Sequence, residues 1–326
     1  WGVTSLLTFW PALMKVVRTQ ATDAEQSKAY GTFEGGRGVF NAAHLAVATA
    51  IFGFFQAKAM PYMGIRAIIV FYSAAPIIVG IIFIFLLKEP EKVDVEATGE
   101  KRKVSFKDML MILKMPVIWL VIIMMYTSYT FNLSSYYFTP YANNIIGVSA
   151  VVAAILTVLA QYVRPFASTI GGFLGDKIGR SETMMIGYVL MIAGVILMDG
   201  TYKMSSSVRM TMVVAACLLV YAGMFCNFGL YFTFISEGGI PLELSGVAIG
   251  VACTLGYLPE VLSYFIGGKL LDKFPGYQGY HLNFMYMLAM GVIGLVVAVI
   301  WSRTYGRKAK LARAEEVQNG KDGKEA

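Results

Sequence analysis

The stretch that decides the fold is GGFLGDKIGR, at residues 171–180. It places one acidic and two basic side chains, Asp176, Lys177 and Arg180, between two long apolar segments. Its glycines allow two helices to approach closely. We expect Asp176 to accept hydrogen bonds from the N–H groups at the start of a neighbouring helix, where the helix dipole favours negative charge. In a soluble protein these ten residues would be an ordinary turn, so the flanking sequence decides their meaning.

The flanking sequence is typical of a membrane protein. Of the 326 residues, 57% are apolar and 14% charged, with a mean hydropathy of +0.63, whereas soluble domains are about a quarter charged. A helix needs about 20 apolar residues to cross a bilayer. We predict nine such spans and an all-α polytopic membrane protein, because these helices would have no polar face in water. The spans are at residues 1–18, 34–55, 66–87, 116–139, 147–172, 183–199, 210–235, 245–268 and 281–302.

Basic residues are distributed unevenly between alternate connections. One set of connections carries 20 of the 27 Lys and Arg residues, and the other set carries 6. The positive-inside rule places the first set, and with it the C-terminus, in the cytoplasm. The net charge of +7 therefore indicates topology rather than a nucleic-acid-binding surface. The first set comprises residues 14–37, 88–115, 174–184, 237–245 and 302–326; the second comprises 56–67, 138–150, 199–210 and 269–280.

The loop, placed between two spans, resembles a known family signature. The pattern Gly172-x3-Asp176-Lys177-x2-Arg180 is similar to the G-x3-D-[RK]-x-G-[RK] motif of the major facilitator superfamily, in its copy between helices eight and nine. The resemblance implies that helices four to twelve are present, whereas helices one to three and the N-terminal copy of the motif are missing. We expect a fragment of a longer gene product, with a true nine-helix protein as the alternative.

The resemblance also implies a division into four parts. A partial N-terminal bundle of helices four to six covers residues 1–87, and a charged central cytoplasmic linker covers 88–115. The six-helix C-terminal bundle, helices seven to twelve, covers 116–302. A polar cytoplasmic tail covers 303–326.

Arg164 is the strongest candidate for a functional group inside the membrane. It precedes Asp176 by twelve residues, or about 18 Å of helix, which places it near the bilayer midplane. A guanidinium at that depth can hold an anion bidentately. The segment QYVRPFASTIGG also resembles the helix-eight R-P segment of nitrate/nitrite-type and organic-anion facilitators, in which the arginine contacts the substrate anion. The alternative is a structural pair with a carboxylate such as Glu260 or one in the missing helices.

Other ionisable residues have competing interpretations. His44 lies in FNAAH, which resembles the W-N-x-A-H of organophosphate/phosphate antiporters and implies a cavity-facing histidine; the alternative is a packing histidine. Glu34 and Arg37 have i, i+3 spacing and favour a gating ion pair, with each other or with the loop motif, over solute contact. For Glu260 three interpretations stay open: it carries a proton, it pairs with Arg164, or it is exposed and has no function. We expect Glu237 at the cytoplasmic surface.

Polar residues on two further spans complete the candidate site. Helices seven and ten line the central cavity in the family that the chain resembles. Tyr129 and Asn132, on helix seven, and Asn227 and Tyr231, on helix ten, are therefore expected to contact the solute. Hydrogen bonding between helices, or an aromatic belt at the membrane interface, remains the alternative for each of them.

These features predict a secondary active transporter, a symporter or antiporter, that moves a small anionic solute, organic or inorganic, by alternating access. A proton or counter-ion would drive it, and we expect a monomer in the bacterial inner membrane. The sequence has no catalytic, cofactor-binding or metal-binding motif, so we predict no enzyme, no cofactor and no metal. A non-transporting receptor or sensor of the same fold is the alternative. The sequence leaves the solute, the coupling ion and the direction of transport open.

Overall fold

A computed structural model describes residues 9–19, 21–22, 25–86 and 106–307, and all regular structure in this part of the chain is helical. The contacts divide the chain into two compact units. One joins Trp1–Gly36 to Val104–Ala326, and the other is Arg37–Lys103. This division falls within helix α2 (Gln26–Ala57) rather than at the linker 88–115. The domain boundaries that the resemblance implies stay a prediction.

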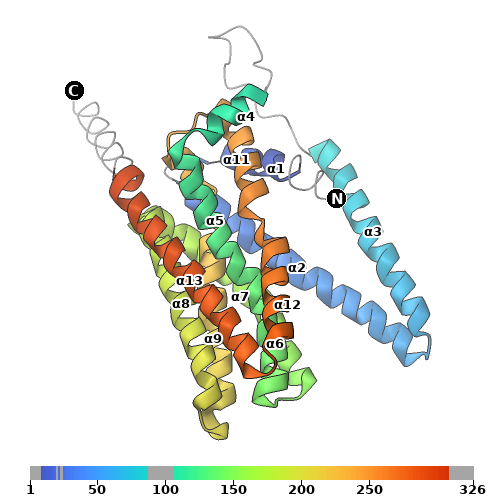
Figure 1. The fold of residues 1–326 in the computed structure, drawn as a ribbon. Coiled ribbons are helices and arrows are strands. Elements are labelled where there is room, and N and C mark those ends of the chain that lie inside the picture. Colours follow the sequence, from blue (N-terminus) through green and yellow to red (C-terminus); the bar gives the residue numbers. More distant parts are fainter. Residues whose placement is uncertain (1–8, 20, 23–24, 87–105, 308–326) are drawn as a thin grey trace, which may run out of the picture. The chain divides into compact units, whose positions relative to one another are not determined.

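The first unit is a helical bundle with a continuous apolar core. Helix α8 lies beside α9 and α13, and α5 lies beside α11, α12 and α13 (Figure 1). Phe131, Tyr188 and Phe284 are among its fully buried side chains. Besides the start of α2, its helices are α1 (Trp10–Thr19), α4 (Phe106–Leu113), α5 (Pro116–Ser134), α6 (Phe138–Tyr141), α7 (Ala150–Ile178), α8 (Arg180–Gly200), α9 (Ser206–Phe228), α10 (Thr233–Glu237), α11 (Leu242–Gly256), α12 (Pro259–Lys273) and α13 (Tyr277–Trp301).

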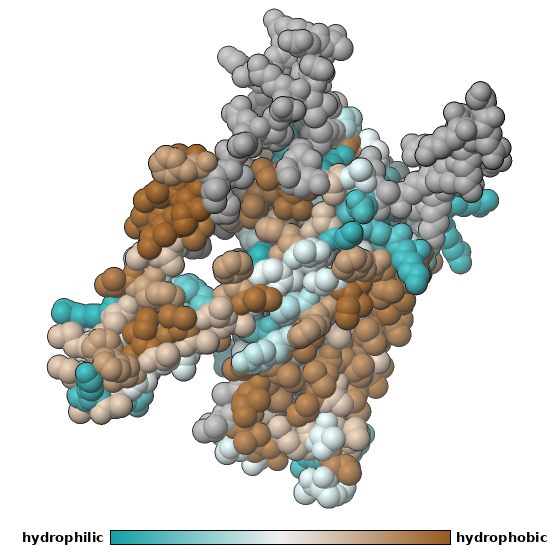
Figure 2. Space-filling model, turned by 180° about the vertical axis from the view of Figure 1, so that it is seen from behind, coloured by the Kyte–Doolittle hydropathy of each residue, from teal (hydrophilic) through white to brown (hydrophobic). Residues whose placement is uncertain are grey.

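The second unit contains the rest of α2 and helix α3 (Pro61–Leu86). Large apolar side chains of α3, such as Ile69, Ile77 and Ile84, are exposed. Apolar side chains also cover much of the molecular face drawn in Figure 2. Outward-facing apolar side chains on long helices are suited to lipid rather than to water.

Seven helical stretches among the described residues are long and apolar enough to cross a membrane, which agrees with the predicted all-α membrane fold. Helix α2 begins earlier than the predicted span, at Gln26 rather than residue 34. The helical run after Pro116 continues to Ile146, through most of the predicted loop 138–150. The seven stretches are Gln26–Ala57, Tyr62–Ile82, Pro116–Ile146, Arg180–Lys203, Ser206–Phe228, Leu244–Lys273 and Tyr277–Gly306.

The predicted span 245–268 lies within the membrane-length stretch Leu244–Lys273, but the helices here and near the linker have details that the sequence analysis did not anticipate. The predicted span 245–268 is interrupted, because α11 ends at Gly256 and α12 begins at Pro259, where a proline is accommodated at the first helical position. Helix α4 lies inside the predicted linker and packs against α5 and α11. The linker residues 87–105, the tail residues 308–326 and residues 1–8 of the first predicted span lie outside the described residues.

Connections that the basic residues assign to one side of the membrane meet at one end of the first unit. There, Arg180 bonds to Ser27 and to Glu237, residues that come from three different connections of the first set. Connections of the second set also meet each other. Asn144 donates to Tyr280, and Asp199 contacts His281 just beyond the connection 269–280. These contacts therefore agree with the prediction, made from the basic residues, that successive connections alternate between the two ends of the bundle.

Candidate functional site

Helix α7 exposes an apolar face and buries a polar one. Arg164 and Ser168 are buried, and Gln161 lies on the same face because residues three, four and seven apart share one side of a helix. A surface helix in water shows the reverse arrangement. In lipid, polar side chains are expected to face the protein interior. The exposed side chains of the opposite face are Tyr162, Phe166, Ile170 and Phe173.

Arg164 forms a buried ion pair with Glu34. Its Nη2 lies 2.7 Å from Glu34 Oε2, and the two side chains are 11% and 5% exposed. The guanidinium also lies over the ring of Phe225, 5.3 Å from its centroid. The carboxylate that pairs with Arg164 is therefore Glu34, and not Glu260, which the sequence analysis named as an example. Sequence reasoning missed this pair because it placed Glu34 at the start of a span, whereas α2 begins earlier and carries Glu34 inward against α7.

The pair with Glu34 does not satisfy the whole guanidinium. Arginine has five N–H donors in a planar fork. Arg164 donates to Glu34 through Nη2, and its buried Nε has no hydrogen-bond partner among the described residues. Buried polar groups without partners are rare in proteins and call for an explanation. A bound anion would supply the missing acceptor.

The start of α2 and the middle of α7 pack along a seam of small residues, which we call the α2–α7 seam: Ser27, Gly31 and Gly35 of α2 and Ser168 and Gly172 of α7. An added Cβ on Gly31 would lie 2.6 Å from Ser168 O and 2.7 Å from Gly172 Cα. An added Cβ on Gly172 would lie 2.9 Å from Gly31 Cα. Only residues without side chains allow this approach, as in other membrane helix pairs.

Asp176 caps the start of α2, as the sequence analysis expected. Its two carboxylate oxygens accept from Ser27 N at 3.1 Å and from Lys28 N at 2.7 Å. These N–H groups belong to the first turn of α2, where the helix has no internal acceptors for them. A negative charge is favourable there because of the helix dipole. Lys177, the next residue, is exposed.

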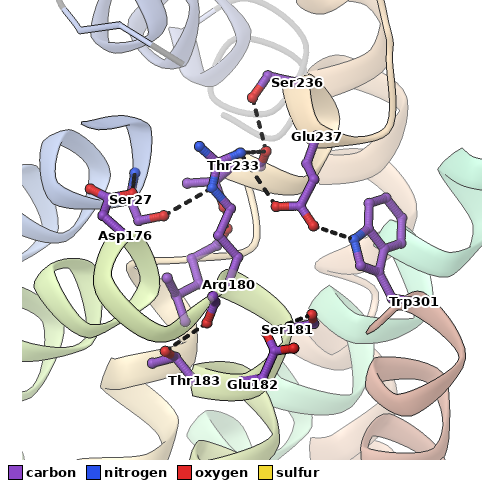
Figure 3. A network of polar contacts seen from close by, with 12 residues as sticks. Ser27, Asp176, Arg180, Ser181, Glu182, Thr183, Thr233, Ser236, Glu237 and Trp301 are labelled. Atoms are coloured by element: carbon purple, nitrogen blue, oxygen red, sulfur yellow. Dashed lines mark hydrogen bonds and ion pairs between the residues drawn. The ribbon is translucent and has the colours of Figure 1, made fainter. Parts of the chain in front are cut away.

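Arg180 is the centre of a buried polar network at this end of the unit (Figure 3). Its Nε donates to Ser27 Oγ at 3.1 Å, and its Nη1 donates to Thr233 O at 3.2 Å and lies 3.5 Å from Glu237 Oε2. Trp301 Nε1 donates to the other oxygen of Glu237 at 2.9 Å. The prediction that Glu237 lies at the surface was wrong, because its side chain is 5% exposed and that of Arg180 is 1% exposed.

A second polar cluster lies at the break between α11 and α12. Tyr129 Oη, from α5, donates to Glu260 Oε1 at 2.7 Å. The Tyr129 ring lies 4.5 Å from that of Tyr257, whose hydroxyl pairs with the hydroxyl of Tyr231 at 3.2 Å. Tyr231 and Tyr257 are buried, whereas Glu260, in the first turn of α12, is exposed. The carboxylate is therefore held by one tyrosine and open on its other side.

The two candidate asparagines have different surroundings. Asn227 is fully buried, and its Nδ2 lies 3.4 Å from Ser128 Oγ on α5, which is the hydrogen bonding between helices that the sequence analysis kept as the alternative. Asn132 is half-buried on α5, and its main-chain carbonyl accepts from Ser135 Oγ at 2.8 Å. A contact between either side chain and a solute stays a prediction.

His44 and Arg37 belong to the second unit. The ring of His44 packs against Phe71 and Tyr72 of α3, at centroid distances of 4.6 and 4.5 Å. Its buried Nε2 has no hydrogen-bond partner in the described part of the chain. Arg37 is half-buried on α2. Their predicted roles in solute binding and gating stay predictions.

Sequence reasoning missed Gln161 and Ser168. Both lie on the buried face of α7 with Arg164, and each has a buried side-chain oxygen without a hydrogen-bond partner among the described residues. Their spacing of three and four residues from Arg164 was the available signal, because such residues share one face of a helix.

Comparisons with known proteins agree with this architecture. The model of the Major Facilitator Superfamily matches residues 2–264. The inner membrane protein YihN of Escherichia coli is 28% identical over 317 residues, which cover 97% of this chain and 75% of the relative. The inner membrane protein YqcE of the same organism is 23% identical over 299 residues, which cover 91% and 69%.

Solved structures support the same fold. A bacterial homologue of the iron transporter ferroportin, crystallised in an outward-facing state, has a TM-score of 0.59 and 10% identity, over 93% of this chain and 68% of that one. The same homologue with soaked iron has a TM-score of 0.60 and 12% identity, over 92% and 68%. At this identity the likeness concerns the fold alone. With the family match over most of its length, the chain belongs to the major facilitator superfamily, a family of membrane transporters.

Proposed function

We propose that the protein is a secondary active transporter that moves a small anionic solute by alternating access, with a proton or counter-ion as the driving species. The observation that carries the proposal is Arg164: a permanently charged, buried guanidinium with one N–H that has no partner among the described residues. A charge at membrane depth costs at least about 2.5 kcal/mol and is usually functional. The pair with Glu34 lowers this cost and leaves donors for a solute.

The surroundings of Arg164 support anion binding. The ring of Phe225 lies 5.3 Å from the guanidinium and gives it an apolar neighbour on that side. Hydrogen bonds to an anion are stronger when both partners are kept from water. An incoming anion would also compete with Glu34 for Arg164, so that binding would weaken a contact between α2 and α7. Solute binding would thereby be linked to the packing of these two helices.

The α2–α7 seam supports alternating access. By the family resemblance, α2 is helix five of the N-terminal bundle and α7 is helix eight of the C-terminal bundle. Asp176 and Arg180 both hold the start of α2 in place. Rocking of the two bundles would separate these contacts. On the charge distribution of the sequence, this end faces the cytoplasm, and we place the protein in the inner membrane.

Carboxylates near the site are candidates for coupling. Glu260 is exposed, so a proton can reach its carboxylate, which also accepts a hydrogen bond from Tyr129. Glu34 would lose part of its contact with Arg164 if a solute anion competed for the guanidinium. We propose that protonation of one of these two carboxylates accompanies each transport cycle.

Uptake into proteoliposomes tests the proposal. The full-length protein would be reconstituted and offered a panel of labelled small anions, neutral solutes and cations. We expect uptake of one or more anions, and its loss in Arg164→Ala. Arg209→Ala is the matched control, because Arg209 is half-buried and donates to the main-chain carbonyl of Met204. Uptake of anions that Arg164→Ala leaves unchanged would exclude the anion site.

A further inference from the structure

We infer that Gln161 and Ser168 bind the solute together with Arg164, and that the solute is an anion that also carries a hydroxyl group. The inference rests on the proposed anion transport and specifies the chemistry of its substrate. The observation behind it is that three polar atoms on one face of α7 are buried without a hydrogen-bond partner among the described residues: Gln161 Oε1, Arg164 Nε and Ser168 Oγ.

The buried hydroxyl of Ser168 has no hydrogen-bond partner among the described residues and lies one turn from Arg164. Buried Ser and Thr hydroxyls in helices commonly donate to the main-chain carbonyl four residues earlier. In this chain Thr127, Thr130 and Thr254 make that bond, at 2.7, 2.9 and 2.8 Å. Ser168 is fully buried and does not make it, and neither do the buried Ser134 and Ser263 of other helices; Ser168 differs from these two in sharing a helix face with Arg164. Its hydroxyl is therefore a hydrogen-bonding group without a partner among the described residues, which a ligand could satisfy once the α2–α7 seam opens.

Residue 161 offers two acceptors rather than one. Its side-chain Oε1 is buried without a partner. Its main-chain carbonyl cannot receive the usual helical hydrogen bond, because residue 165 is a proline and has no N–H. Residue 161 lies three positions before Arg164, at about 4.5 Å of axial rise along the helix. This part of α7 therefore has a cation next to acceptors that need a donor.

Complementarity to these groups defines the ligand. Arg164 Nε requires an acceptor, which a negatively charged group supplies best. The oxygens of Gln161 require a donor, and Ser168 can donate or accept. A hydroxyl suits the acceptors better than an ammonium group does, since the guanidinium one turn away repels a second cation. The charge and the hydroxyl of the ligand would lie within about 5.4 Å of each other, the rise of one helical turn.

The test compares two carboxylates that differ in hydroxyl groups. Thermal unfolding of the purified full-length protein would be followed with increasing glycerate or propionate. We expect glycerate to reach half of its stabilising effect at a lower concentration than propionate. Gln161→Met and Ser168→Ala should each raise the glycerate concentration required by roughly 2- to 12-fold, the equivalent of one hydrogen bond, and leave the propionate concentration unchanged. Thr254→Val, which removes a hydroxyl that bonds to its own helix, is the matched control.

The outcomes separate this inference from the proposed function. Loss of the glycerate preference in both variants, with the control unchanged, would support the inference. An unchanged preference in both variants would overturn it, because a purely structural role of these residues alters unfolding without ligand and not the ratio of the two anions. Equal binding of glycerate and propionate by the unmodified protein would overturn it and leave anion transport standing. Stabilisation by neither carboxylate would count against the inference, and the uptake panel would still decide whether the protein transports an anion.

Discussion

Substitution of Gly31 by alanine is expected to open the α2–α7 seam. The added methyl carbon would lie 2.6 Å from Ser168 O and 2.7 Å from Gly172 Cα, which are main-chain atoms that cannot turn aside. Overpacking of this kind costs about 1–3 kcal/mol. If the open state avoids the clash, the equilibrium between closed and open seams shifts by roughly 5- to 150-fold.

The intrinsic effect of alanine on the helix has to be separated from the clash. Alanine favours a helix over glycine by about 1 kcal/mol wherever it is placed. Gly36→Ala is the matched control, because Gly36 lies on the same helix and an added Cβ there meets nothing within 4 Å. The difference between the two variants therefore isolates the close approach of the two helices.

Cysteine labelling measures the opening. A cysteine at Thr169, whose hydroxyl an added Cβ on Gly35 would meet, would report on the seam after the three buried native cysteines are replaced by alanine. We expect a maleimide to label it faster in Gly31→Ala than in Gly36→Ala, by the factor given above. Equal labelling rates in the two variants would refute the reasoning that the seam is closed by the contact at Gly31.

Three further predictions concern the loop that contains Asp176 and Arg180. Asp176→Ala should lower the unfolding free energy by about 1 kcal/mol through loss of the α2 cap, with Lys177→Ala near neutral, as checked by chemical denaturation in detergent. Arg180→Ala should lower the unfolding free energy by about 3–5 kcal/mol, because it leaves Glu237 buried without this cation. Adding Glu237→Gln should recover part of that loss. A much smaller loss in Arg180→Ala alone would contradict the buried network. A cysteine at residue 177 should react with an impermeant maleimide only in inside-out vesicles, and reaction in right-side-out vesicles would reverse the topology.

Most of the helical architecture could be predicted from the sequence, because apolar length and basic residues report directly on membrane spans. The ends of the helices were harder to predict from the sequence. Polar residues such as Glu34 were interpreted as marking the start of a span, yet α2 begins at Gln26 and buries Glu34 against α7. The predicted continuous helix over 245–268 overlooked that Pro259 can begin a new helix.

The buried ion pair was predictable in one of its residues but not in the other. Arg164 was identified because a charge inside an apolar span is costly wherever it faces. Its partner Glu34 lies 130 positions away in the sequence, so only the packing of α2 on α7 could reveal it. The burial of Glu237 depends in the same way on Arg180 and Trp301, which come from other helices. Gln161 and Ser168 needed only the helical period around Arg164.

Equilibrium binding of a labelled anion to the purified full-length protein tests the central claim most directly, because it separates the contact with Arg164 from coupling and movement. The ligand would be an anion identified by the uptake panel. We predict that Arg164→Gln abolishes measurable binding, that Arg164→Lys weakens it by losing the bidentate geometry, and that Arg209→Ala binds like the unmodified protein. Unchanged affinity in Arg164→Gln would contradict the account, whatever the helices around it do.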